Sequence, residues 1–430
     1  MVNYYLKIFG CAMNYADAER VASVLRDLKL ERTETLAEAD LALLFTCSVK
    51  QKSEDKVFGV LENLREWKAE KTGRKIGLTG CMVRKTSSQS TEKKDSLLRR
   101  SDVLDFVWRI EDSAQLARLL TLANNESTAS DFFSIQPLHK NAAQVSIPIS
   151  TGCDNFCSYC IVPHARGREI SRSENEVLEE CEKAVKNRAI EITLLGQNVN
   201  SYQKKAGVFA KLLGKVAQIP KLKRLRFVSS HPKDFDEDVI EVMAENENIE
   251  RHLHLPAQHG DDEILEKMNR KYTSENYLKL LKKFRAKLPT ASVTTDFIVG
   301  FPGETNEAFE NLLNFYREAD FDFAYFSKYS PRPETPAASF ADQVSREKKS
   351  ERFEALNNLL IETTSKKYAQ LENKTLEVLV EKCRAGICEG KSSEFFSTKF
   401  EGDENLVGKM VKIKIVKPRE VELWGERVES

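Results

Sequence analysis

The first 120 residues repeat one pattern: a short apolar run, a polar or glycine-bearing turn, and an amphipathic stretch. In the amphipathic stretches, apolar residues recur at three-and-four spacing, as at Val57, Leu61 and Leu64, which predicts helices with one face packed on a sheet. Strands that alternate with helices are typical of a parallel α/β sheet. We expect the three strands at residues 4–10, 40–46 and 75–80.

Beyond residue 140, six further apolar runs alternate with helical patterns. One helical pattern covers residues 274–288, where Tyr277, Leu281 and Phe284 share a face. Six parallel strands with intervening helices predict an open (βα)6 partial TIM-type barrel, whose functional edge lies at the carboxyl ends of the strands. The six runs cover residues 145–149, 191–195, 224–228, 252–256, 293–299 and 323–329.

The period of the hydrophobic pattern changes in the C-terminal part of the chain. A helical stretch at residues 345–372 is followed by five short alternating runs, which predict a small five-stranded β-barrel, a fold that often binds oligonucleotides. Polar linkers are expected at residues 87–94 and 124–130. The fold class is therefore α/β with a C-terminal β-barrel, in three predicted domains: residues 1–125, 140–370 and 371–430.

The composition is that of a globular protein. Apolar residues make up 41% of the chain and charged residues 31%, which allows several buried cores. No apolar run reaches the roughly 18–20 residues needed to cross a bilayer, and the N-terminus lacks a signal-peptide layout. We therefore expect a cytoplasmic protein without membrane contact. We also expect a monomer. The formal net charge is zero, so any contact with RNA must come from local basic clusters.

Three of the nine cysteines, Cys153, Cys157 and Cys160, form a C-x3-C-x2-C motif directly after the first barrel strand. In a reducing compartment, such spacing favours metal ligation over disulfides. Three thiolates can hold three irons of a four-iron cluster and leave the fourth iron open for a substrate. The alternative is a structural zinc ion, for which His164 is the adjacent fourth ligand.

A second set, Cys11, Cys47 and Cys81, directly follows the three N-terminal strands at intervals of 36 and 34 residues. Each interval matches about one strand–helix unit, so we expect the three cysteines at the same carboxyl edge of a parallel sheet. That placement favours a second site with three thiolate ligands. Three buried structural cysteines are the alternative. The remaining cysteines are interpreted as structural thiols: Cys181, Cys383 and Cys388.

The cysteine motif after the first strand of a partial barrel resembles the radical S-adenosylmethionine (SAM) superfamily. Further segments resemble the methylthiotransferases, in particular the branch that modifies isopentenylated adenosine in tRNA. The resemblance spans essentially the whole chain and includes a C-terminal barrel similar to the TRAM domain. The segments are FGCAMN, TCSVKQKSEDKV, GCM, CSYCIVPHARGREISR, LLGQNVNSY, DFIVGFPGET and YSPRPETPAA.

This resemblance implies two four-iron, four-sulfur (4Fe–4S) clusters. The barrel cluster would bind SAM and split it to a 5′-deoxyadenosyl radical, and the N-terminal cluster would supply sulfur for C2 of an adenosine beside the anticodon. A second SAM would supply the methyl group. An aromatic C–H bond offers no acidic proton and no leaving group, so a radical initiator suits this reaction better than a serine or histidine triad. The implied partners are tRNA, an electron donor and a sulfur donor.

Other residues are candidate cofactor contacts. By the resemblance, Tyr159 would lie against the adenine of SAM, and Gly300 and Gly303 would let the backbone approach the adenosine. Ordinary packing and a plain turn are the alternatives. Amides that follow the second barrel strand suit recognition of SAM or an adenine edge. The further cofactor candidates are Gln197, Asn198, Asp296 and Glu304.

Basic and polar residues beyond the cysteine loop are candidate RNA contacts. Arginine side chains there can neutralise tRNA phosphates or the SAM carboxylate, and a solvated basic face is the alternative. The basic runs at residues 221–226 and 99–100 are weaker candidates, because such runs are usually plain surface. The RNA candidates are Arg166, Arg168, Arg172 and Asn200.

Two segments depart from the family pattern. Ala12 stands where the tRNA branch has glutamine, and residues 256–263 replace small polar residues. Neither change touches a cluster ligand. Sibling enzymes that act on threonylcarbamoyl-adenosine or on an aspartate of a ribosomal protein are therefore alternatives. Two alternatives of other classes are an RNA-binding protein with structural zinc and a radical SAM methylase with one cluster.

Overall fold

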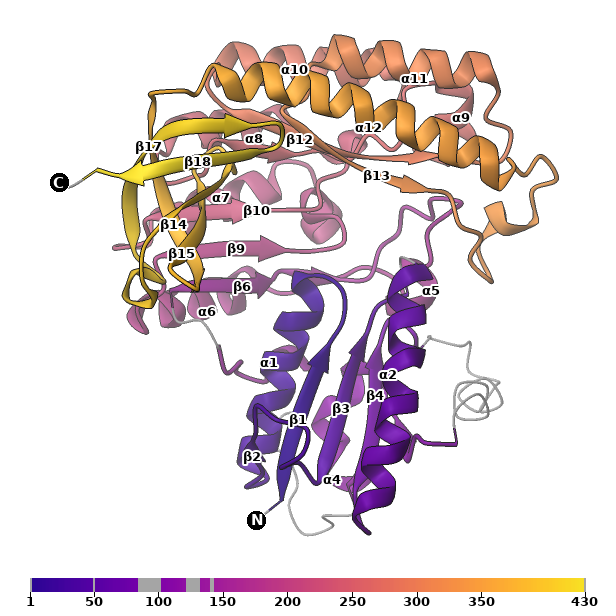
Figure 1. Ribbon diagram of the computed structural model, residues 1–430, viewed down its shortest axis with the longest axis vertical. Helices are drawn as coiled ribbons and strands as arrows, with labels where there is room; N and C mark the ends of the chain where they lie inside the picture. The colour runs from indigo at the N-terminus through magenta and orange to yellow at the C-terminus, as the bar shows by residue number, and fades with distance from the viewer. Residues whose placement is uncertain (1, 49–50, 84–101, 121–131, 140–142, 429–430) are drawn as a thin grey trace.

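The computed structural model contains three groups of strands that follow one another along the chain (Figure 1). No helix in the part of the chain that it describes is both long and apolar enough to cross a membrane. The two predicted linkers and the basic pair Arg99 and Arg100 lie outside that part. The structure describes residues 2–48, 51–83, 102–120, 132–139 and 143–428.

The N-terminal sheet has five parallel strands in the order β2-β1-β3-β4-β5. Alternate side chains of β3 face two cores: Leu43 packs on the side of α1 (Ala12–Asp27), and Leu44 packs on the side of α2 (Gln51–Glu70). Helices on both faces explain why β3 is apolar almost throughout. The strands are β1 (Asn3–Ile8), β2 (Glu31–Arg32), β3 (Leu41–Thr46), β4 (Lys75–Gly80) and β5 (Phe106–Val107).

The central part contains the six predicted strands, but they form two three-stranded sheets in place of one continuous sheet. The sheets have the orders β10-β9-β6 and β11-β12-β13, and a bridge between Leu225 of β10 and Ile249, three residues before β11, connects them. All pairings are parallel, so the carboxyl ends share one edge. The strands are β6 (Gln144–Pro148), β9 (Glu191–Leu195), β10 (Arg224–Phe227), β11 (His252–His254), β12 (Ser292–Val299) and β13 (Phe323–Lys328).

One hydrophobic core combines both central sheets with the helices that cover them. Cys181 is fully buried in this core, as expected for a structural thiol. The covering helices are α6 (Glu174–Lys186), α7 (Val208–Ala217), α8 (Glu237–Glu245), α10 (Ser274–Lys287), α11 (Asn306–Ala319) and α12 (Arg346–Ala369). Shorter elements are α4 (Leu116–Leu119), β7 (Ser150–Thr151), α5 (Val162–Arg166), β8 (Ile170–Ser171) and α9 (Asp262–Lys267).

The five C-terminal strands close into a barrel in the order β14-β15-β16-β18-β17. The barrel lies at the amino ends of the central strands (yellow in Figure 1). There Arg224 donates to the carbonyl oxygens of Glu377 and Lys391, and Arg226 donates to that of Ser392. The strands are β14 (Thr375–Arg384), β15 (Ile387–Ser392), β16 (Ser397–Glu401), β17 (Met410–Arg419) and β18 (Glu422–Arg427).

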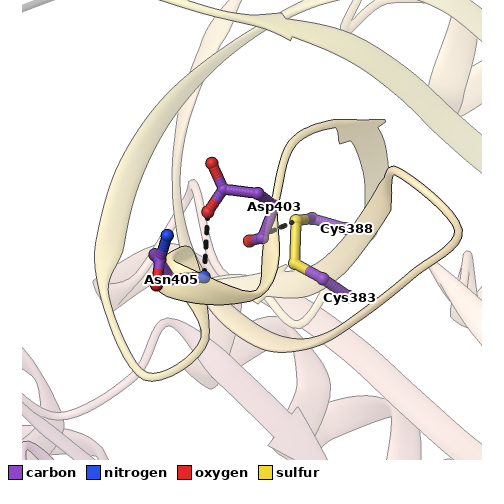
Figure 2. The surroundings of a disulfide bond; sticks show 4 residues. All are labelled: Cys383, Cys388, Asp403 and Asn405. Carbon is purple, nitrogen blue, oxygen red and sulfur yellow. Dashed lines mark hydrogen bonds between the residues drawn. A yellow bond between two sulfur atoms is a disulfide. The ribbon is translucent and has the colours of Figure 1, made fainter.

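Cys383 and Cys388 form a disulfide, so the prediction of two structural thiols is wrong here (Figure 2). The two cysteines face each other across the antiparallel pair β14 and β15, with their Cα atoms 4.0 Å apart. The register of the hairpin therefore brings the sulfurs together, which their spacing in sequence alone does not reveal. Cys388 Sγ also lies 3.4 Å from the carbonyl oxygen of Asp403.

Thiol counting tests this bond. Alkylation of the denatured, metal-free chain is expected to modify seven of the nine cysteines without a reductant and all nine with one. Cys388→Ala should give eight modified cysteines under both conditions, because Cys383 then loses its partner. Mass spectrometry of the alkylated chain measures the count, and nine modified cysteines without reductant would contradict the disulfide.

One face of α1 attaches the N-terminal sheet to the central part, and Glu54 of α2 adds an ion pair with Arg332 at 3.3 Å. Arg20 in α1 donates to both carboxylate oxygens of Glu180 in α6 at 2.8 Å, and Glu180 also pairs with Arg172 at 2.8 Å. These three side chains are at most 3% exposed, so solvent screens the pairs little. The apolar part of the same interface consists of Met13, Ala16, Leu195 and Val228.

Glu180→Ala is expected to lower the free energy of unfolding by roughly 3–5 kcal/mol, because it leaves two buried guanidinium groups without their carboxylate. Glu179 is exposed on the same helix, so Glu179→Ala should change stability by less than about 0.5 kcal/mol. Denaturant unfolding of the metal-free chains measures both values. Equal stabilities of the two variants would show that the buried pairs do not hold the interface.

Candidate functional site

The three N-terminal cysteines lie at the ends of three neighbouring strands. Cys11 follows β1 and caps α1, Cys47 follows β3, and Cys81 follows β4. The strand order β1-β3-β4 places Cys47 in the middle. The amide of Cys81 donates to the carbonyl oxygen of Thr46 at 2.9 Å, which ties the second and third cysteine segments together. The expected convergence at one carboxyl edge is therefore present.

Two glycines allow these segments to come so close. Gly10 has φ +108° and Gly80 has φ +95°, values that favour glycine. A Cβ atom at Gly10 would lie 2.7 Å from Cys47 Cβ and 3.2 Å from its sulfur, and one at Gly80 would overlap the Thr46 carbonyl. The residues before Cys11 and Cys81 therefore have no side chain because the neighbouring strand end occupies that space.

The other three cysteines lie on one loop between β7 and α5. Cys153 and Cys157 are buried, and Cys160 is half-buried. Burial raises the pKa of Cys153 to about 11 and that of Cys160 to about 12. These thiols are thus neutral in the metal-free chain near pH 7, and metal binding must displace their protons. Arg270 Nη1 lies 3.5 Å from Cys157 Sγ and can stabilise its thiolate.

Among the residues in the described ranges, no three His, Cys, Asp or Glu side chains lie close enough to share a single metal ion. A single zinc ion draws all its ligands to one centre at about 2.0–2.3 Å. In a four-iron cluster, each cysteine binds a different iron, so the thiolates stay further apart. Three thiolates in each set supply the ligand type and number that a four-iron cluster with one open iron takes.

Buried polar atoms without a protein partner gather where the strands of the first central sheet end. They belong to segments that follow β6, β9 and β10, and Val199 N donates to Ser229 O at 3.3 Å, which joins the last two segments. Such groups cost free energy unless a ligand or water satisfies them. SAM, with its amine, carboxylate, hydroxyl and adenine groups, fits this need. The atoms are Ser150 Oγ, Gln197 Oε1, Asn198 Oδ1, Asn200 Oδ1 and Nδ2, Ser230 Oγ and His231 Nε2.

A chain of contacts leads from these atoms to the cysteine loop. His231 Nδ1 accepts from the Lys233 amide, so its Nε2 carries the hydrogen and lacks an acceptor. The His231 ring packs edge-on against Tyr272, with 5.8 Å between centroids. The hydroxyl of Tyr272 accepts from Arg270 Nε at 3.1 Å, and Arg270 contacts Cys157. No sequence motif marks Arg270, Tyr272 or His231, so the pattern of the sequence does not predict their place in this site.

The predicted cofactor residues beyond the cysteines have mixed placements. Tyr159 is half-buried against a small hydrophobic cluster. Gly300 and Gly303 have φ +70° and +81°, and the space beside them holds the side chains of Lys349 and Lys267. The turn itself therefore favours glycine at both positions, and the cofactor contact stays a prediction.

Glu304 and Asp296 already have protein partners. Glu304 accepts from the Gly300 amide at 2.7 Å and pairs with Arg352 at 2.8 Å, so its buried carboxylate shapes its own loop. Its predicted cofactor contact is therefore replaced by a structural role. Asp296 pairs with His254 Nε2 at 3.0 Å and is 37% exposed, which leaves it accessible to a ligand.

Arg172 is buried in the ion pair with Glu180, so its predicted contact with RNA is wrong. In the basic run at residues 221–226, Arg224 and Arg226 are buried beneath the C-terminal barrel, so they do not contact RNA. Lys221 and Lys223 are exposed and stay weak candidates. Asn200 is 5% exposed and belongs to the group of buried polar atoms after β9, so its side chain is not accessible to RNA. Arg168 is 71% exposed and stays accessible to RNA.

Arg166 is also buried, and it connects the two sets of cysteines. It ends α5, six residues after the last cysteine of the loop, and donates to Asn14 Oδ1 at 2.8 Å and Asp17 Oδ2 at 2.7 Å in α1. Asn14 in turn donates to the carbonyl oxygens of Phe9 at 2.6 Å and Thr46 at 2.9 Å, beside two N-terminal cysteines. The predicted RNA contact of Arg166 is therefore replaced by a link between the two sites.

Asn200→Leu is expected to weaken SAM binding about tenfold or more, because it removes two polar atoms that lack protein partners. The metal-free chain should keep or gain stability, since leucine leaves no unsatisfied buried amide. Calorimetric titration with SAM and thermal unfolding measure the two effects. Asn63→Leu, at an exposed position of α2, is the control. Unchanged SAM affinity would remove Asn200 from the cofactor site.

Family models match two parts of the chain. The radical SAM superfamily matches residues 147–316, and "Uncharacterized protein family UPF0004" matches residues 3–99. A radical SAM methyltransferase, TsrM, from Kitasatospora setae shares the fold, with a TM-score of 0.57, 16% identity and coverage of 79% of this chain and 75% of that one. The fold and the cysteine loop thus define a radical SAM enzyme.

Curated relatives narrow this class. The chain is 38% identical to the tRNA-2-methylthio-N(6)-dimethylallyladenosine synthase of Halalkalibacterium halodurans, over 99% of this chain and 81% of the relative. It is also 38% identical to the synthase of that name from Bacillus subtilis, over 99% of this chain and 86% of the relative. The chain belongs to the family of tRNA-2-methylthio-N(6)-dimethylallyladenosine synthases.

Proposed function

We propose that the protein adds a methylthio group to C2 of N6-isopentenyladenosine next to the anticodon of tRNA, with two 4Fe–4S clusters and two SAM per product. The observation that carries this proposal is the pair of three-cysteine sites, each at the carboxyl edge of a parallel sheet and linked through Arg166. When bound, the clusters and SAM supply a radical that removes hydrogen from the adenosine and a sulfur atom that replaces it.

The chain itself binds and orients these groups. Cys153, Cys157 and Cys160 would hold the barrel cluster, and Arg270 would favour the thiolate of Cys157. The orphaned amides and hydroxyls after β9 and β10 would bind the polar groups of SAM. Cys11, Cys47 and Cys81 would hold the second cluster, and the contacts of α1 would keep it facing the first. An electron donor and a sulfur donor complete the cycle.

At the level of domains, the proposal assigns residues 1–125 to the second cluster, residues 140–370 to the radical SAM core and residues 371–430 to RNA binding. The two parallel sheets joined at one bridge support an open partial barrel. The closed five-stranded C-terminal barrel supports the likeness to the TRAM domain. The names of the relatives favour isopentenyladenosine over threonylcarbamoyl-adenosine or a ribosomal aspartate.

The decisive variant is Cys47→Ala. Anaerobically reconstituted wild type should be brown and hold about eight irons, and Cys47→Ala about four. The variant should still cleave SAM and should form no methylthio product, because only the second cluster is lost. Cys181→Ala, at a buried cysteine outside both sets, should behave as wild type. Product formation by Cys47→Ala would instead indicate a one-cluster enzyme, and a colourless zinc protein would indicate an RNA-binding protein.

The substrate is tested by mass spectrometry of tRNA nucleosides from cells with and without the gene. Loss of 2-methylthio-N6-isopentenyladenosine, with accumulation of N6-isopentenyladenosine, is the expected result. Unchanged levels of the methylthio nucleoside would exclude this substrate, and loss of the threonylcarbamoyl derivative would point to the sibling activity.

A further inference from the structure

An exposed aromatic ring lies on the cysteine loop itself. Phe156 stands between Cys153 and Cys157 in sequence, yet it is 39% exposed while both cysteines are buried. Eight large apolar side chains are exposed in the described part of the chain, and Phe156 is the one phenylalanine among them. Ile170, 56% exposed, lies on β8, which pairs with β7 at the start of the same loop. The apolar surface thus borders the candidate active site.

The backbone at Phe156 has an unfavourable conformation. Phe156 has φ +48°, a left-handed conformation that is rare for a bulky side chain. The side-chain amide of Asn269 donates to the carbonyl oxygens of Asn155 at 3.1 Å and Phe156 at 3.0 Å, which clamps the conformation. Strain of this kind persists where the surroundings enforce it, and it concentrates at functional sites.

A guanidinium group extends the surface. The Arg168 guanidinium carbon lies 4.4 Å from the centroid of the Phe156 ring, and the side chain is still 71% exposed. Asp154 holds Arg168 at 3.4 Å and, through its other oxygen, Lys204 at 2.6 Å. Arg168 and Lys204 thus place two cations beside the aromatic ring, and the carboxylates of Asp154 and Glu169 lie next to them.

We propose that Phe156 and Arg168 form a stacking surface for an unpaired base of the RNA substrate, at a nucleotide that neighbours the modified adenosine. Unpaired bases stack on aromatic rings and on guanidinium planes, and nearby cations bind the phosphates. Lys204 is placed for that second contact. The ring lies outside the buried cysteines, so its occupant is a neighbour of the reacting base. This inference rests on the proposed function, because it requires RNA as the substrate.

The test uses full-length reconstituted enzyme and an anticodon stem–loop RNA that carries isopentenyladenosine. Phe156→Ala and Arg168→Glu should each weaken RNA binding about tenfold and raise KM more than they lower kcat. Phe156→Tyr should restore the affinity, because it keeps the ring. Arg188→Glu, at an exposed position near the amino end of β9, is the charge-matched control and should have a smaller effect.

Abasic RNAs identify the stacked nucleotide. If one base lies on Phe156, an abasic site at that position should weaken binding to wild type, and Phe156→Ala should weaken it no further. At every other position, the loss of RNA affinity caused by the abasic site and the loss caused by Phe156→Ala should add. If no position of the loop shows such coupling with Phe156→Ala, the proposal is overturned.

Iron content and SAM cleavage without RNA show whether the cysteine loop is intact. If Phe156→Ala loses iron, Arg168→Glu decides the outcome, since its side chain lies outside the backbone clamp. Intact clusters with unchanged RNA affinity would refute the stacking surface and leave the methylthiotransferase function standing. Slower reduction by a protein electron donor, with unchanged RNA affinity, would assign the surface to that donor. Failure of wild type to form the methylthio product would refute the function itself.

Discussion

The arrangement of the two cysteine sites depends on the buried ion pairs between α1 and the central part. Asp17 and Arg20 lie on one face of α1, and they bind Arg166 and Glu180 on the other side of the interface. Because Cys11 caps α1 and α5 follows the cysteine loop, these contacts act directly on both sites. A shift of α1 along the interface would move three cysteines together relative to the other three.

Charged contacts suit this role better than apolar ones. An apolar face tolerates small sliding movements, because its contacts are non-directional. A hydrogen-bonded ion pair is directional, and the cost of leaving either charge unpaired in the interior penalises other positions. The few apolar contacts of α1 with Leu195 and Val228 therefore contribute buried apolar surface, and the ion pairs fix the position of α1 along the interface.

The sequence predicted the strands and the convergence of Cys11, Cys47 and Cys81 well, because periodicity and a cysteine at each strand end are local signals. The sequence did not predict that Arg166 and Arg172 are buried in ion pairs. Arginine is usually exposed, and the partner of Arg166 in α1 is 149 residues away, so nothing local marks it as buried. The disulfide was missed for a similar reason, since it depends on the register of a hairpin. The division of the six central strands into two sheets also depends on which strands pair, and the local pattern of the sequence does not specify that.

The C-terminal barrel has a consequence for how RNA can bind. Arg224 and Arg226 pair with Glu250 at 3.0 Å and 2.8 Å. Both arginines also donate hydrogen bonds to carbonyl oxygens of the barrel, which fixes the barrel at the amino ends of the central strands. The cysteines lie at the opposite, carboxyl ends. An RNA that contacts the barrel and the active site together must therefore extend past the length of the strands. The barrel itself therefore lies away from the carboxyl edge at which both sets of cysteines are found.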